Sequence, residues 1–99
     1  MTLDDHQAIT NWVYGRLKET GRYDAVFKNA EYHTGYYDGE FDVLTTKNGV
    51  RHYYEVKSHD TPQALKKAKE QFRRAYFAFP SAEWKFIYVT PTRIKRCQV

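Results

Sequence analysis

Residues 40–58, which read EFDVLTTKNGVRHYYEVKS, carry the clearest structural signal in the chain. Two stretches rich in β-branched and aromatic residues flank Asn48-Gly49, the dipeptide most typical of a two-residue type I′ hairpin turn. We therefore expect antiparallel strands over Glu40–Thr46 and Val50–Ser58, joined by this turn.

The turn fixes which residues face each other across the hairpin. Counting outward from it puts Asp42 opposite Glu55 and Glu40 opposite Lys57, and all four share one face because side chains two apart on a strand point the same way. Facing carboxylates with Cβ atoms roughly 4.5–5.5 Å apart repel each other, so a sheet has no structural reason to pair them. A divalent cation removes that repulsion, and Mg²⁺ accepts carboxylate oxygens. A longer turn would break this register.

The segments around the hairpin predict the order α-β-β-β-α-β. A strand, a helix and a further strand imply a right-handed crossover and at least one parallel pair. We therefore expect one α/β domain over residues 1–99, with a mixed central sheet flanked by helices. The expected segments are a helix over about Asp5–Thr20, a strand within Tyr23–Tyr32, a loop over Thr34–Gly39, a helix from Pro62 to about Phe79, a strand over Trp84–Thr90 and a basic tail over Arg93–Arg96.

The composition excludes several classes of protein. No apolar run approaches the ~18–20 residues that a membrane-spanning helix needs, and the polar start of the chain does not resemble a secretory signal. The single cysteine, Cys97, allows no internal disulfide and has no base near it in sequence that would make it a nucleophile. We expect a protein of the reducing cytoplasm with no membrane partner. The net charge of +4 suits an anionic partner.

The second predicted helix has an apolar face and a basic face. Its apolar residues fall within an arc of roughly 100°, which would pack on the sheet. Gln71 lies on the flank of this arc, where its amide either reaches over the sheet toward the hairpin or is an ordinary surface amide. The opposite side and one flank are either a solvated face or a DNA-binding face, and they carry Lys66, Lys67, Lys69, Arg73 and Arg74.

The run Gly39-Glu40-Phe41-Asp42, then Glu55-Val56-Lys57 on the next strand, then Gln71 on the following helix resembles the PD-(D/E)XK nuclease superfamily. The predicted order of elements is similar to the common core of that superfamily, a restriction-endonuclease-like domain, over nearly the whole chain. The small size and the Glu55–Ser58 run resemble archaeal and viral Holliday junction resolvases and small phage replication-repair nucleases.

The resemblance implies roles for five residues. Asp42 and Glu55 would bind Mg²⁺ or Mn²⁺, helped by the carbonyl of Val56. Lys57 would orient or deprotonate the attacking water or stabilise the charged phosphorane, and we favour a fixed positive charge. Gln71 would position active-site groups.

The chain departs from the superfamily pattern in two places. Phe41 precedes Asp42 where proline is common, and the glutamate that resolvase-type members carry on the first helix is missing. Glu19 and Glu40 are the candidate additional acids, although Glu40 is better explained as an ion-pair partner of Lys57.

Other residues have both a functional and a structural interpretation. Tyr36 and Tyr37, in the glycine-bracketed loop, would stack on DNA or pack on the domain. The four histidines lack the spacing of metal ligands, so we expect most of them at the surface or in loops. They are His6, His33, His52 and His59.

Together these features predict a Mg²⁺- or Mn²⁺-dependent endonuclease. Its substrate would be branched or double-stranded DNA in replication, recombination or repair, in a virus or mobile element. A twofold homodimer would let two sites cut paired strands. Two alternatives stay open: a restriction-like or exonuclease domain of the same superfamily, and a catalytically inactive DNA-binding accessory module.

Overall fold

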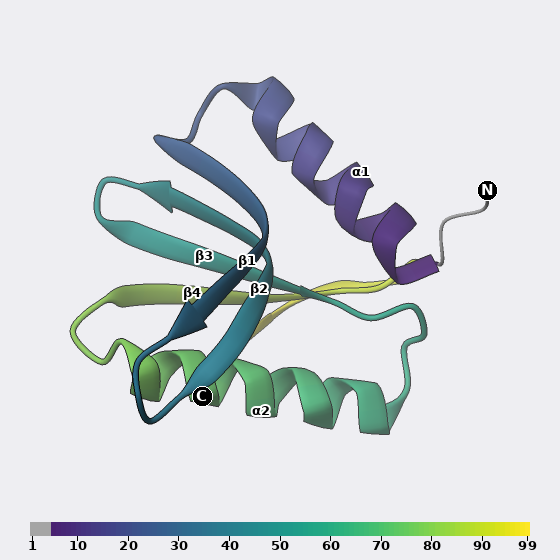
Figure 1. Cartoon of the computed structure of the whole chain (residues 1–99). Coiled ribbons are helices and arrows are strands. Elements are labelled where there is room, and N and C mark those ends of the chain that lie inside the picture. Colours follow the sequence, from purple (N-terminus) through teal and green to yellow (C-terminus); the bar gives the residue numbers. More distant parts are fainter. Residues whose placement is uncertain (1–4) are drawn as a thin grey trace.

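The computed structural model describes residues 5–99 as a five-stranded mixed sheet with one helix against each face (Figure 1). The strand order in the sheet follows the chain order. Only β3 and β4 run parallel, and α2 is the crossover between them. The elements are α1 (Asp5–Thr20), β1 (Ala25–His33), β2 (Asp38–Lys47), β3 (Val50–Val56), α2 (Pro62–Ala78), β4 (Glu83–Val89) and β5 (Ile94–Cys97).

Each helix covers its own hydrophobic core. The core beneath α2 is largely aromatic and includes Tyr53, Phe72 and Tyr88, all fully buried. The core beneath α1 is aliphatic and includes Val13 and Val43. Within residues 5–99, no helix is both long and apolar enough to cross a membrane.

The expected hairpin is confirmed. Asn48 and Gly49 both have positive φ, 52° and 80°, which is the backbone conformation of a type I′ turn and the reason these two residue types occupy it. The ladder between β2 and β3 starts at Lys47 opposite Val50, as counted from the sequence, and continues in that register to Val43 opposite Tyr54.

The predicted order of elements lacks one strand, because most of the basic tail after β4 forms a fifth strand, β5. Thr90 closes a turn in which its backbone N–H donates to the carbonyl of Arg93 (2.8 Å) and its Oγ1 accepts from the backbone N–H of Arg93 (3.0 Å). The chain thus reverses and β5 pairs antiparallel with β4. The boundaries of β3 also differ, since the strand ends at Val56 and Lys57 follows it.

Candidate active site

The candidate site lies where β2 and β3 stop pairing. Their ladder ends at Val43 and Tyr54, although both strands continue beyond this pair. Just past it, Asp42 Oδ2 accepts a hydrogen bond from the backbone N–H of Val56 at 2.8 Å. This bond satisfies a buried backbone donor that the ladder has left free. This bond therefore fixes the Asp42 carboxylate at the fork, the point where β2 and β3 separate.

Two buried carboxyl groups meet at this fork. Asp42 is 7% exposed and Glu55 is 6% exposed. Burial raises the pKa of Glu55 to about 8, and the charge of Asp42 and a side-chain hydrogen bond with Asp42 add to this rise. The expected meeting of the two acids is therefore found, and Glu55 resists ionisation while no cation is beside it.

A tyrosine and a lysine hold Glu55. The Tyr53 hydroxyl donates to Oε1 at 2.5 Å, and Lys57 Nζ lies 3.4 Å from Oε2. Burial, followed by the charge of Glu55, raises the pKa of Tyr53 well above its ordinary value, so this hydroxyl stays a donor. The Lys57 side chain is only 24% exposed and presents its ammonium group beside the carboxylate.

The two carboxyl groups open into a pocket of about 370 Å³. Gln71 of α2 lines it, so the structure brings this predicted residue to the two acids. Gly39 also lines it, and a Cβ at Gly39 would collide with the ring of Tyr32 on β1. A glycine is therefore required next to the acids. The described residues around the pocket are Glu31, His33, Gly39, Glu40, Asp42, Glu55, Gln71 and Arg74.

His6 is a site residue that the sequence interpretation missed. Its Nε2 lies 3.3 Å from Asp42 Oδ2, and its backbone carbonyl accepts from the Thr10 hydroxyl at 2.8 Å. A usable signal was present, since His6 precedes the buried residues Thr10 and Val13 at helical spacing and so shares their face.

Of the two candidate additional acids, Glu40 lies at the site and Glu19 does not. The prediction for Glu19 was wrong, because it lies at the other end of α1, roughly 20 Å from His6 at 1.5 Å per residue, and faces Arg16 on the surface. Glu40 lines the carboxylate pocket. Its expected ion pair with Lys57 is absent within residues 5–99, because the β2–β3 ladder ends before these two positions and Lys57 pairs with Glu55 instead.

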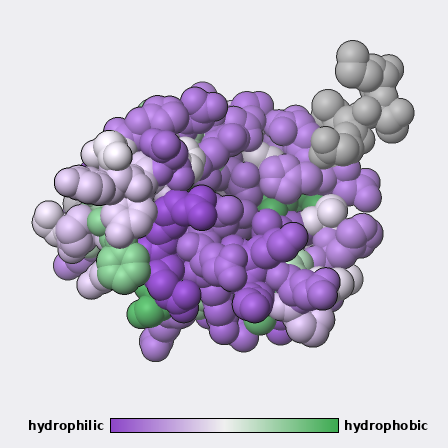
Figure 2. All heavy atoms as spheres, turned by 60° about the horizontal axis from the view of Figure 1, so that its bottom comes forward, coloured by the Kyte–Doolittle hydropathy of each residue, from purple (hydrophilic) through white to green (hydrophobic). Residues whose placement is uncertain are grey.

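The four candidate DNA-binding cations of α2 are all exposed but lie on two sides of the helix. Arg74 lines the carboxylate pocket, and Lys67 lines a neighbouring pocket of about 350 Å³ together with Lys57. Lys66 and Arg73 line a different pocket. Figure 2 brings the α2 side of the molecule forward and shows a largely hydrophilic surface. Only Lys67 and Arg74 are thus placed next to the candidate site.

The loop before β2 presents one free aromatic ring. Tyr36 is 94% exposed, whereas Tyr37 stacks on Phe77 of α2 with ring centroids 6.3 Å apart. Tyr37 therefore packs on the domain, and Tyr36 stays available to a partner.

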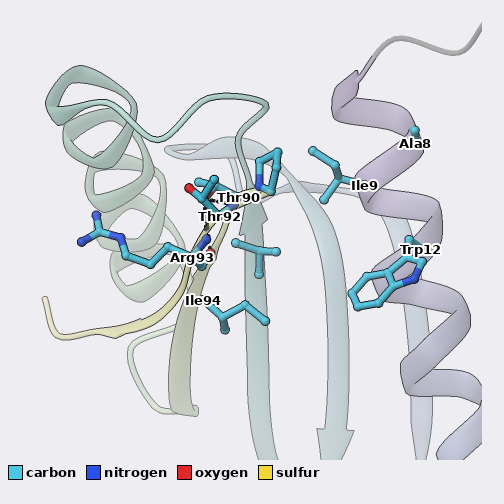
Figure 3. A pocket seen from close by; sticks show the side chains of 9 residues that line it. Ala8, Ile9, Trp12, Thr90, Thr92, Arg93 and Ile94 are labelled. Atoms are coloured by element: carbon cyan, nitrogen blue, oxygen red, sulfur yellow. Dashed lines mark hydrogen bonds between the residues drawn. The ribbon is translucent and has the colours of Figure 1, made fainter.

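A larger and more apolar pocket, of about 670 Å³, lies between α1 and the turn before β5. Figure 3 shows Ile9 and Trp12 of α1 pointing toward that turn, while Arg93 points away. The only charged residue among the described residues that line it is Arg93, which pairs with Asp60 at 3.0 Å. This pocket offers no acid or base for hydrolysis, so the smaller acidic pocket is the better candidate for chemistry.

The acidic pair fits a hard divalent cation. Among residues 5–99, no group of three or more His, Cys, Asp and Glu side chains is arranged to hold a metal ion. Mg²⁺ does not need such a cage, because it binds through one or two carboxylates and keeps several waters. Asp42 and Glu55 supply two carboxylates in contact, and the backbone of Val56 lies against them.

No protein-family model and no curated protein matches this chain.

Proposed function

We propose that this protein is a Mg²⁺- or Mn²⁺-dependent endonuclease that hydrolyses phosphodiester bonds of branched or double-stranded DNA. The observation that carries the proposal is the contact between two buried carboxyl groups, Asp42 and Glu55, with the ammonium group of Lys57 beside them. The order α-β-β-β-α-β up to β4 supports a restriction-endonuclease-like domain of the PD-(D/E)XK type. Its role would be in replication, recombination or repair, in a virus or mobile element.

Each site residue would have its own role in hydrolysis. Asp42 and Glu55, with the carbonyl of Val56, would hold the cation, which lowers the pKa of a bound water and neutralises charge on the phosphate. Lys57, whose ammonium group lies beside Glu55, would supply a fixed positive charge to the pentacovalent phosphate as it gains negative charge. Gln71 reaches the same pocket from α2 and would orient the phosphate or the water.

Two groups hold the acids in place for this reaction. Tyr53 fixes one oxygen of Glu55, and the Val56 N–H fixes one oxygen of Asp42. A carboxylate held in one orientation loses little freedom when it binds a cation, which favours binding.

Charge around the site supports a nucleic-acid substrate. Arg74 and Lys67 flank the acids, and the whole chain carries a net charge of +4. Lysine and arginine side chains bind phosphates through release of condensed counterions, whatever the base sequence.

A cleavage assay tests the proposal. The protein would be incubated in Mg²⁺ or Mn²⁺ with labelled linear, nicked, flap and four-way DNAs of equal length. We expect internal cuts, fastest in a branched DNA, and none with Asp42→Asn. Linear duplex cut as fast as the four-way DNA would favour a restriction-like enzyme, and release from the ends an exonuclease. No cleavage by the folded protein would contradict the proposal and favour an inactive DNA-binding module.

We also propose a twofold homodimer, whose paired sites would cut two strands at once. Sedimentation equilibrium gives the mass directly. Twice the monomer mass supports the dimer, and a monomer at all micromolar concentrations contradicts it.

A further inference from the structure

A row of cations crosses the face of the sheet opposite α2. On this face α1 packs against β1, β2 and β3. Lys47 of β2 and His52 of β3 share the face, since residue 52 pairs with Thr45 and residues 45 and 47 are two apart. On β4, Lys85 pairs with His52 and so lies on the same face. Ile87, two residues further along β4, shares this face and pairs with Arg96 of β5, so Arg96 also lies on it.

The charged members of this row are free to meet a partner. Lys47, Lys85 and Arg96 are exposed, and none of them forms an ion pair within residues 5–99. Their positive charges also act on His52. Burial and then the charges of Lys85, Arg96 and Lys47 lower the pKa of His52.

The row is long enough to follow a phosphate backbone. Neighbouring strands lie about 4.8 Å apart, so a row from β2 to β5 spans roughly 14 Å. Two exposed acids lie by the row: Glu83, two residues before Lys85 on β4, and Asp24, whose Oδ2 accepts from the backbone N–H of Asn48 next to Lys47. The three cations therefore outnumber these two acids, and the row keeps a positive balance.

The row and the α2 cations lie on opposite faces of the sheet. Lys67 and Arg74 belong to α2, which packs on the other side (Figure 1). The molecule measures 38 × 33 × 25 Å, whereas duplex DNA stays straight over lengths of about 50 nm. A single linear duplex can therefore lie along one of the two surfaces but cannot wrap around both.

We propose that the row formed by Lys47, Lys85 and Arg96 binds a second duplex arm of a branched DNA, while Lys67 and Arg74 hold the arm at the acidic site. This inference rests on the proposed function and deepens it, because it selects branched over linear DNA as the substrate class.

Binding without cleavage tests this inference. Fluorescence anisotropy in EDTA would compare a four-way DNA with a linear duplex of equal length over a series of salt concentrations. We expect Lys85→Gln to bind the four-way DNA about three- to tenfold more weakly and to reduce its salt slope by about 1, with little change for the linear duplex. Glu83→Gln should have the opposite effect and strengthen binding of the four-way DNA.

Lys95→Gln is the matched control. Lys95 is an exposed lysine on β5, but it pairs with Tyr88 and so points to the other face. Equal losses for Lys85→Gln and Lys95→Gln, or equal losses on both DNAs, would overturn the inference. So would a wild-type protein that binds neither DNA.

The two proposals can fail separately. A protein that shows the expected Lys85 effect but cuts nothing in Mg²⁺ supports the second arm and contradicts the nuclease. A protein that cuts DNA but shows no Lys85 effect supports the nuclease and contradicts the second arm.

Discussion

The side chain of Asp42 replaces a strand partner as a hydrogen-bond acceptor. It accepts the hydrogen bond of the Val56 N–H at the point where the β2–β3 ladder ends, so this buried donor stays paired. The same bond holds its carboxylate against Glu55. The position of a single aspartate thus joins the local backbone to the candidate chemistry.

The raised pKa of Glu55 predicts how stability depends on pH in metal-free buffer. The folded pKa is about 8, against an ordinary value of 4.5, so the folded state retains a proton that the unfolded state releases between these values. The stabilisation is complete below about pH 4.5 and is lost as the pH rises through 8. We expect the free energy of unfolding to fall over this window by up to ~1.4 kcal/mol per pH unit.

Urea denaturation at several pH values, in EDTA, measures this effect. Glu55→Gln should be more stable than wild type at pH 8 and nearly equal to it at pH 4.5. The difference between the two proteins isolates Glu55 from His33, whose pKa is also raised, chiefly by its hydrogen bond to Asp38. Parallel pH profiles for the two proteins would show that Glu55 ionises normally.

His6 predicts a second effect at the residue scale. Its imidazole lies 3.3 Å from the Asp42 oxygen that the Val56 N–H also holds, so it helps to orient the carboxylate. Removing a group that orients a ligand typically weakens metal binding by about 10–100-fold. We expect this loss for His6→Ala in calorimetric titrations with Mn²⁺, and partial rescue in His6→Gln, which keeps a hydrogen-bond donor. Wild-type affinity in His6→Ala would limit His6 to packing.

At the scale of elements, α2 combines three functions in its sequence. One face packs on the sheet, one flank brings Gln71 and Arg74 to the acids, and Lys67 approaches Lys57 on the same side. Residues 67, 71 and 74 follow helical spacing, which explains why they share that side.

This division predicts unequal roles for the four cations of α2. Lys67→Ala with Arg74→Ala should weaken DNA binding and flatten its salt dependence by about two phosphate contacts. Lys66→Ala with Arg73→Ala removes the same charge from another side of the helix and should have a much smaller effect. Anisotropy titrations at several salt concentrations measure both. Equal losses of DNA affinity in the two double variants would show that DNA does not bind preferentially along Lys67 and Arg74.

Periodicity in the sequence predicted most of these elements, because the signals are local. The bounds of α1, the type I′ turn and the register of the hairpin all follow from spacing of a few residues. The strand β5 was missed because its turn depends on the Thr90 hydroxyl, which accepts from the Arg93 N–H. The ion pair of Glu40 was also misplaced, because the point where two strands part is set by tertiary packing.

At the scale of the whole molecule, the sheet separates two positively charged surfaces. The acidic pocket opens on the α2 side, and the row through Lys85 and Arg96 crosses the opposite face. The expected pairing of Asp42 with Glu55 came from one hairpin. Helical spacing could have placed His6 on the buried face of α1, but its contact with Asp42 depends on how α1 packs against β2.

Titration of Mn²⁺ into the metal-free protein, followed by calorimetry, tests most directly whether Asp42 and Glu55 share a divalent cation. We predict binding by the wild type and a loss of at least tenfold in affinity in both Asp42→Asn and Glu55→Gln, with unchanged circular dichroism. Glu19→Gln, which removes an acid far from the fork, should bind like the wild type. Equal Mn²⁺ affinity in the wild type and in Asp42→Asn would show that Asp42 and Glu55 do not share a divalent cation.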